Sequence, residues 1–257
     1  NNFGANFTGA NGSISNLIMR YSPRTALRAT ASATSWSITD VQVLNNNEHG
    51  MQLESGSGQN FNLTRVDSNY NTYNCVIFSN IVNSTFDSSN FNFNGWSGFV
   101  IGSGTVKGNV VKKSVAEYNG LSGFVVNYIA GGGGEIFEFN RANNNAQTTA
   151  DRQGFALFGV GTVVRYNLAY SNDVAGGVGS GINVDNTADR NEIYYNLSYS
   201  NGGQGIAARG DGDTTGHHIH NNVLYHNKNG LELYGTDVDN IVIKNNIISE
   251  NSNLALR

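Results

Sequence analysis

Cysteine, proline and charged residues are all scarce in this 257-residue chain. It has one Cys and one Pro, and Asp, Glu, Lys and Arg together make up 13% of the residues, with a net charge of −4. A single Cys excludes an intramolecular disulfide, and Cys75 falls at an inward strand position, which favours a core residue over a nucleophile. The charge balance offers no basic surface to a nucleic acid, and no apolar run approaches the length of a membrane span. We therefore expect neither a nucleic-acid partner nor a membrane.

Glycine recurs at a nearly constant interval. The positions are Gly50, Gly98, Gly123, Gly154, Gly181, Gly205 and Gly230, with Asn74 in the slot between the first two. Most steps are 24 or 25 residues, with longer steps before Gly154 and Gly181. A period of about 20–30 residues is typical of repeat proteins, and each unit holds short strands without helical periodicity. The sequence predicts an all-β solenoid of about nine to ten coils that stack through parallel strands. A β-propeller is the alternative, but its blades are normally about 40 residues or longer.

Asparagine recurs in register with the glycines. One column is Asn140, Asn167, Asn196, Asn222 and Asn246, and another is Asn94, Asn119, Asn172, Asn201, Asn227 and Asn251. Asn tolerates the left-handed backbone conformation and bonds nearby backbone groups, so we expect it at the corners of the coils. Stacked amides can also bond along a column. A disordered Asn-rich segment is the alternative, but these Asn alternate with regularly spaced Ile, Val, Leu and Phe.

Alternation in the strand after each Gly assigns its two faces. The inward positions are Met51, Leu53, Phe99, Ile101, Phe124, Val126, Phe155, Leu157, Ile182, Val184, Ile206, Ala208, Leu231 and Leu233. One outward column is Gln52, Val76, Val100, Val125, Ala156, Asn183, Ala207 and Glu232, and the other is Glu54, Phe78, Gly102, Asn127, Phe158, Asp185, Arg209 and Tyr234. Adjacent coils place such side chains about 4.8 Å apart. The early coils present mainly apolar groups outward, whereas the later coils present polar and aromatic groups.

The later outward residues form the candidate site. Insertions before Gly154 and Gly181 lead into the strands of Phe158 and Asp185, and long loops on a rigid scaffold often carry function. The candidate catalytic residues are Asp185, Arg209, His217, His218 and Tyr234, which include the types needed for acid–base chemistry. The candidate substrate-binding residues are Asn127, Tyr128, Asp151, Arg152, Phe158, Asn183 and Glu232. The alternative interpretations are an exposed ion pair between Asp185 and Arg209 and ordinary surface histidines at 217 and 218.

Metal-binding patterns are weak. Asp211 and Asp213 stand in G-D-G-D, which lacks the spacing of an EF-hand calcium loop, so we interpret it as a turn and keep calcium as the alternative. No zinc-ligand spacing or nucleophile elbow is present. The sequence therefore predicts no metal and no other cofactor.

Two stretches resemble a known family. S-V-A-E-Y-N-G-L-S-G-F-V-V-N-Y-I-A-G-G (114–132) and, more loosely, N-G-G-Q-G-I-A-A-R-G (201–210) are similar to the catalytic modules of secreted alginate (mannuronan) C-5 epimerases. The resemblance implies a single-stranded right-handed parallel β-helix, the fold of many polysaccharide lyases and glycoside hydrolases. The family's D-P-H-E motif would fall just after Gly98, where this chain reads F-V-I-G-S-G-T and so lacks it. G-I-N-V-D-N (181–186) resembles the strand that carries a nucleophilic Asp in some β-helix glycosidases, although Ala208 and Arg209 stand where the acid is expected.

Three functions follow from this resemblance. The first is proton abstraction at C-5 of an acidic polysaccharide, by a lyase or an epimerase, with Arg209 neutralising the uronate carboxylate, His217 or His218 as base and Tyr234 as acid. The second is glycoside hydrolysis with Asp185 paired to Asp151, Asp211 or Glu232. The third is a non-catalytic β-helix that binds glycans or acts as a spacer in a larger surface protein. Fold alone does not decide among them.

We expect residues 1–257 to form one β-helix domain, secreted or at the cell surface, and monomeric. The chain begins N-N-F-G-A-N, without an evident signal peptide, and neither end has an obvious amphipathic cap. These features indicate a mature or trimmed form, or part of a longer protein.

Overall fold

The computed structural model describes the chain except residues 1–3, 31, 55–59, 103, 128–132, 150–151, 174–176, 178, 185–189, 211–213, 236–237 and 257, and at residues 54, 209, 210, 214, 215, 234 and 238 it describes the backbone only. Throughout this part the elements are strands, and there is no helix. Accordingly, no helix among the described residues could cross a membrane. The predicted all-β class is confirmed.

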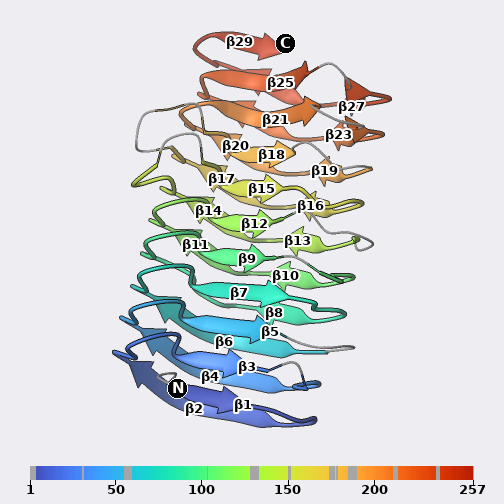
Figure 1. Cartoon of the computed structure of the whole chain (residues 1–257). Helices are drawn as coiled ribbons and strands as arrows, with labels where there is room; N and C mark the ends of the chain where they lie inside the picture. Colours follow the sequence, from blue (N-terminus) through green and yellow to red (C-terminus); the bar gives the residue numbers. More distant parts are fainter. Residues whose placement is uncertain are drawn as a thin grey trace.

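The strands form three parallel sheets of a right-handed β-helix (Figure 1): two begin in the first coils, and the third begins only at β11. The first sheet has 11 strands: β1 (Ala5–Phe7), β3 (Leu27–Ala29), β5 (Met51–Glu54), β7 (Val76–Ser79), β9 (Phe99–Ile101), β12 (Phe124–Val126), β15 (Phe155–Leu157), β18 (Ile182–Val184), β21 (Gln204–Gly210), β25 (Asn229–Gly235) and β29 (Leu254–Leu256). The second sheet has 10: β2 (Ser13–Arg20), β4 (Ser37–Leu44), β6 (Asn62–Asn69), β8 (Thr85–Asp87), β10 (Val110–Lys112), β13 (Ile136–Glu138), β16 (Val163–Arg165), β19 (Glu192–Tyr194), β23 (His218–His220) and β27 (Val242–Lys244). The third sheet has 6: β11 (Val115–Glu117), β14 (Arg141–Asn143), β17 (Leu168–Tyr170), β20 (Leu197–Tyr199), β24 (Val223–Tyr225) and β28 (Ile247–Ser249). A short pair, β22 (Thr214–Thr215) and β26 (Val238–Asp239), lies outside them.

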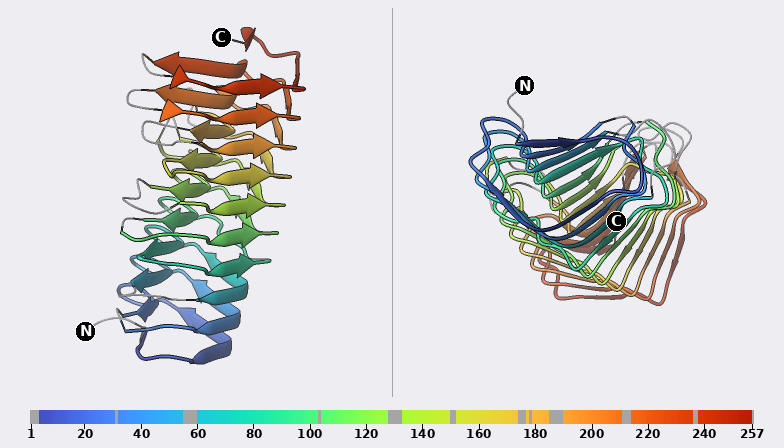
Figure 2. Two further views of the ribbon diagram at one scale, coloured as in Figure 1. Left: turned by 90° about the vertical axis from the view of Figure 1, so that its right-hand side faces the viewer. Right: turned by 90° about the horizontal axis from the view of Figure 1, so that it is seen from below.

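Successive coils superimpose along one axis, and the chain runs from one end of the stack to the other (Figure 2). Each coil buries its inward residues against those of the coils above and below. Phe124 and Phe155, for example, are paired in register with their rings stacked 5.0 Å apart, and both are fully buried. Burying such a side chain stabilises the fold by about 1.5–3 kcal/mol. The predicted inward column of the first sheet is therefore confirmed in these coils.

One coil is out of the predicted register. Met51 pairs with Val76, and Val76 pairs with Phe99, so Cys75 and not Asn74 occupies the glycine slot. Val76 and Phe78 consequently face the core and are fully buried, while Ile77 faces outward. The prediction that Val76 and Phe78 point outward is wrong, because Cys75 replaces the glycine that marks the slot in other coils. The thiol of Cys75 donates to the carbonyl of Ser68 and is fully buried, and burial raises its pKa.

The glycine slot is narrow because neighbouring coils approach closely there. A Cβ on Gly123 would lie 2.7 Å from the carbonyl oxygen of Gly154 and 2.8 Å from the side-chain nitrogen of Asn145. Distances under about 3 Å to a backbone atom require the backbone to shift. Close packing between coils, not a positive φ, therefore explains this glycine.

The left-handed residues at the corners are not the Asn of the predicted columns. The residue directly before each column Asn has positive φ, and it is often aromatic: Phe139 has φ 57°, Tyr166 56° and Tyr195 55°. The expectation that the column Asn themselves adopt this conformation is wrong. Non-glycine residues in this region cost about 1 kcal/mol or more each, so other interactions must hold the corner.

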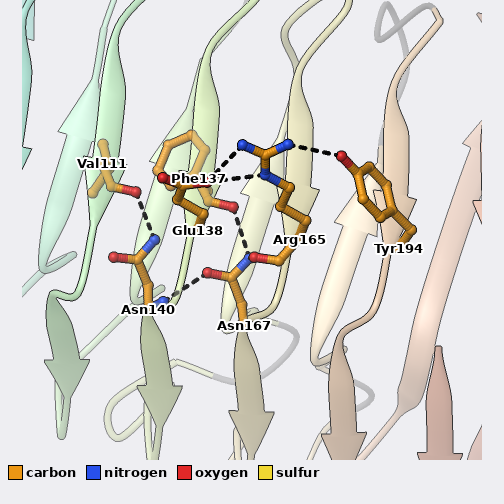
Figure 3. Close-up of polar contacts among 7 residues, drawn as sticks. All are labelled: Val111, Phe137, Glu138, Asn140, Arg165, Asn167 and Tyr194. Carbon is orange, nitrogen blue, oxygen red and sulfur yellow. Dashed lines mark hydrogen bonds and ion pairs between the residues drawn. The ribbon is translucent and has the colours of Figure 1, made fainter. Parts of the chain in front are cut away.

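Those interactions are hydrogen bonds from the column Asn (Figure 3). Asn167 is 2% exposed. Its side-chain amide donates to the carbonyl of Phe137 at 2.8 Å, and its Oδ1 accepts from the backbone N–H of Asn140 at 2.8 Å. The same pattern repeats along the column, with Asn196 and Asn222 as the next rungs. The predicted bonding along both Asn columns is confirmed, and Asn145 is an additional rung between Asn119 and Asn172.

Candidate functional site

The outer face of the first sheet is hollowed into a groove of about 390 Å³. Its floor takes one outward residue from each of four adjacent strands: Ile77 of β7, Val100 of β9, Val125 of β12 and Ala156 of β15. These residues are direct register partners, so they form a continuous apolar strip along the solenoid axis. Trp96, Leu121 and Phe158 stand beside the strip and also line the groove.

The floor is more buried than its outward direction suggests. Val100 is 5% exposed, Val125 8% and Ala156 2%. The predicted outward orientation of these three residues is correct, but they form a small buried apolar cluster with Ile77 and Phe158 packed against it. A shielded apolar floor with a few polar groups around it is typical of a ligand-binding cleft.

An aromatic wall borders the groove. Trp96 is 45% exposed and its ring stacks on Tyr73 with centroids 4.4 Å apart. The ring of His49 lies 5.5 Å from Tyr73, and partial burial lowers the pKa of this imidazole. An exposed indole supported from behind by a second ring can stack on the apolar face of a sugar.

Neither Trp96 nor Tyr73 is among the residues expected from the sequence. The sequence does contain a pattern that could have identified them. The residue two positions before the glycine slot forms a column in successive coils: Tyr73, Trp96, Leu121 and Arg152. The column ends in Arg152, a predicted substrate-binding residue. The correct register at Cys75 was needed to place Tyr73 in this column.

Three predicted substrate-binding residues line the groove: Asn127, Arg152 and Phe158. Asn127 and Arg152 are exposed and Phe158 is half-buried. Asn127 and Phe158 each follow a floor strand, and their backbone N–H groups donate to Ile101 and Val126 of the preceding coil. Tyr128 and Asp151 lie outside the described residues. The groove therefore combines an apolar floor, an aromatic wall and one cation.

The floor becomes polar beyond Ala156. Asn183, Ala207 and Glu232 follow in register on β18, β21 and β25. Glu232 is 6% exposed, and its Oε2 accepts hydrogen bonds from the amides of Gln204 at 2.6 Å and Asn229 at 2.7 Å. Gln204 in turn accepts from the hydroxyl of Ser180 at 2.7 Å. The predicted residue Glu232 is thus a carboxylate held in a fixed position on this face.

The backbones of Arg209 and Tyr234 lie at the same end of the first sheet. Their backbones are direct register partners on β21 and β25, two residues beyond Ala207 and Glu232. Strand alternation places residues two apart on the same face of a sheet. The prediction that Arg209 and Tyr234 occupy equivalent positions is confirmed for the backbone. Asp185 lies outside the described residues, so its proximity to Arg209 stays a prediction.

The two histidines lie elsewhere. His218 begins β23 of the second sheet and is exposed, and its register partner is Glu192. His217 is fully buried, and its Nδ1 accepts the backbone N–H of Asn191 at 3.1 Å. It is a rung of a third polar ladder, which includes Ser84, Asn109, Glu135, Thr162 and Asn191. The structure therefore does not bring His217 or His218 together with Arg209 on the first sheet.

Metal ligands can be examined only in part. Asp211 and Asp213 lie outside the described residues, and the calcium alternative there stays untested. Within the part of the chain that the structure describes, no cluster of three or more His, Cys, Asp or Glu side chains could hold a metal ion.

Comparison with known proteins shows structural similarity without a sequence-family match. No protein-family model and no curated protein sequence matches the chain. The A-module of a mannuronan C-5 epimerase from Azotobacter vinelandii has a similar structure, with a TM-score of 0.65 and 15% identity over 93% of this chain and 78% of the module. A periplasmic alginate epimerase matches with a TM-score of 0.64 and 12% identity over 88% of this chain and 61% of its own. An alginate lyase from Paenibacillus sp. matches with a TM-score of 0.59 and 12% identity over 98% of this chain and 90% of the lyase.

Proposed function

We propose that this protein binds an acidic polysaccharide along the outer face of the first sheet and acts on it at the polar end of that face. The main support for this proposal is the groove. Its apolar floor and the exposed Trp96 suit sugar rings, and Arg152 lies at its rim. Arg209 adds a cationic residue on β21 of the same sheet. The shared fold with alginate epimerases and an alginate lyase supports the same substrate class. Since one structural neighbour is a periplasmic alginate epimerase, we expect a secreted or cell-surface protein.

The reaction that we propose is proton abstraction at C-5 of a uronate residue, as in a lyase or an epimerase. Arg209 would pair with the uronate carboxylate, because a guanidinium offers two parallel hydrogen bonds to it. Its charge would also stabilise the enolate that forms when the C-5 proton leaves. Return of a proton to the opposite face inverts C-5, whereas expulsion of the O-4 glycosyl group leaves a double bond between C-4 and C-5.

The general base of this reaction must be a residue other than His217 or His218, because His217 is buried and His218 lies on the second sheet. Glu232 and Tyr234, two residues apart on β25, belong to residue types that can accept and donate a proton. Glu232 is positioned by Gln204 and Asn229, and Tyr234 is the register partner of Arg209. We assign proton transfer to this pair.

Glycoside hydrolysis is the second candidate. The buried, amide-held carboxylate of Glu232 favours it, since glycosidases use two carboxyl groups and one of them is commonly desolvated. Asp185, Asp151 or Asp211 would have to supply the second carboxyl group.

A substrate screen distinguishes the candidates. The protein is incubated with polymannuronate, polyguluronate, polygalacturonate and a neutral β-glucan. Ultraviolet absorbance of a new C4–C5 double bond identifies a lyase, proton NMR of inverted C-5 an epimerase, and reducing ends without absorbance a hydrolase. Arg209→Ala should abolish turnover of a uronate polymer. Absence of both binding and turnover on all three uronates would sink the proposal, and binding without turnover would leave only the glycan-binding part of it.

A further inference from the structure

A second hollow, of about 480 Å³, lies on coils of the second sheet. Two rows of side chains line it, from β2, β4, β6 and the residues just after β8. The first row is Asn16, Asp40, Arg65 and Ser88, and the second is Ile18, Gln42, Asp67 and Asn90. Members of the second row are register partners on adjacent coils, so their side chains follow one another at about 4.8 Å.

The backbone creates this arrangement. Every residue of the first row has positive φ, between 52° and 54°, and interrupts the alternation of its coil. The strands β2, β4 and β6 continue through this residue, so each coil presents two outward side chains, two residues apart, to the same hollow. The hollow thus has eight side chains from four coils and belongs to a sheet other than that of the groove.

The charges of the side chains that line this hollow nearly cancel. The guanidinium of Arg65 forms two hydrogen bonds with the carboxylate of Asp40, at 2.6 Å and 2.8 Å. Asp67 is the remaining charged lining residue and leaves a net charge of −1. A uronate would be repelled here, in contrast to the groove with Arg152.

The remaining groups suit hydroxyls. Asn90 donates to one oxygen of Asp67 at 2.6 Å. The side-chain amides of Asn16 and Gln42 make no hydrogen bond to any described residue, so each presents donors and an acceptor. Ile18, 57% exposed, supplies an apolar surface beside them.

We propose that this hollow binds a neutral saccharide, at a site separate from the groove of the first sheet. Amides and a carboxylate match vicinal hydroxyl groups, which donate and accept at once, and Ile18 matches the C–H face of a sugar ring. A calcium ion fits less well, because Asp40 is committed to Arg65, the guanidinium charge lies within the hollow, and calcium prefers several free carboxylate oxygens. The inference does not depend on the proposed reaction.

Isothermal titration calorimetry of the whole protein tests the site with maltohexaose, cellohexaose and mannohexaose as neutral probes, and with hexamannuronate and calcium chloride as comparisons. We expect at least one neutral hexasaccharide to bind. Gln42→Ala and Asp67→Asn should each weaken that binding about threefold to tenfold or more, as loss of one hydrogen bond does. Both residues are half-buried and face outward, so unchanged thermal melting is expected and is checked first.

Two controls separate the hollow from other sites. Gln147→Ala removes an exposed amide elsewhere on the chain and should leave binding unchanged, and so should Trp96→Ala in the groove. The proposal is overturned if none of the three neutral probes binds, or if Trp96→Ala abolishes their binding while Gln42→Ala does not. It is also overturned if calcium binds and Asp67→Asn removes that binding, which would assign the hollow to a cation.

Discussion

The backbone N–H of Asn140 donates to the side-chain oxygen of Asn167, 2.8 Å away and one coil further along the solenoid (Figure 3). The same Asn167 donates to the carbonyls of Phe137 and Arg165. One buried amide thus satisfies backbone groups of two coils, next to a corner where Tyr166 is held at positive φ. The ladder of such amides offsets the strain of the corners.

Replacing one rung should therefore be costly. We expect Asn167→Ala to lower the free energy of unfolding by about 1–3 kcal/mol, because it leaves buried donors and acceptors without partners. Arg165→Ala on the same coil is the matched control. Its guanidinium bonds Glu138 at 2.7 Å and the Tyr194 hydroxyl at 3.0 Å, and these bonds raise the pKa of Arg165. It is one third exposed, so its loss should cost about 1 kcal/mol or less. Urea denaturation measures both, and equal losses would contradict the structural role of the ladder.

The two faces of β12 should respond differently to truncation. Phe124 is fully buried in the core, and Phe124→Ala should cost about 3–5 kcal/mol of unfolding free energy. Val125 lies on the groove floor, where truncation leaves a gap open to the groove, so Val125→Ala should cost only about 1 kcal/mol. Thermal or chemical denaturation of the two variants provides the measurement. A larger loss for Val125→Ala would mean that the faces are reversed.

Trp96 should contribute to polysaccharide binding and little to stability. Its ring is 45% exposed above the groove, so Trp96→Ala removes a stacking surface rather than a core residue. We expect the dissociation constant for a bound uronate oligosaccharide to rise about threefold to tenfold, as loss of one aromatic contact implies. Tyr118→Ala, which removes an aromatic residue of similar exposure at another corner, should leave it unchanged. If a titration with the oligosaccharide gives the same dissociation constant for Trp96→Ala and Tyr118→Ala, Trp96 does not belong to the binding site.

Glu135 should make stability depend on pH. It is fully buried in the third polar ladder, and burial raises the pKa of its carboxyl from 4.5 to about 7. The unfolded chain therefore releases this proton near pH 4.5, whereas the folded protein holds it until about pH 7. Folding is progressively penalised as the pH rises from about 4.5 through 7, and the full penalty, about 3 kcal/mol, applies above that range.

The variant Glu135→Gln removes the titrating group and should lose this part of the pH dependence. Urea denaturation at several pH values between 5 and 8 measures it. Glu192→Gln, at an exposed position of the second sheet, is the control and should keep the parent profile. A Glu135→Gln variant whose stability declines with pH as steeply as the parent would show that this carboxyl is not the cause.

The repeat, the parallel strands, the inward residues after each glycine and the two Asn columns follow from the sequence, because each depends on a period of one coil or on strand alternation. Phe124, Phe155 and Asn167 illustrate this, since each recurs at a fixed position in the repeat and meets the equivalent residue of the next coil. The remaining features depend on which different residues of adjacent coils come into contact, and only the tertiary structure shows that. Cys75 takes a glycine slot and shifts one strand by a residue, and Trp96 becomes a wall because it stacks on Tyr73 of the preceding coil. His217 is a rung of a ladder because its imidazole meets Asn191 one coil away. Strand alternation in the sequence identifies the outward residues of each coil. Only the packing of the coils determines which of these residues are buried, which contact residues of another coil and which are open to a ligand.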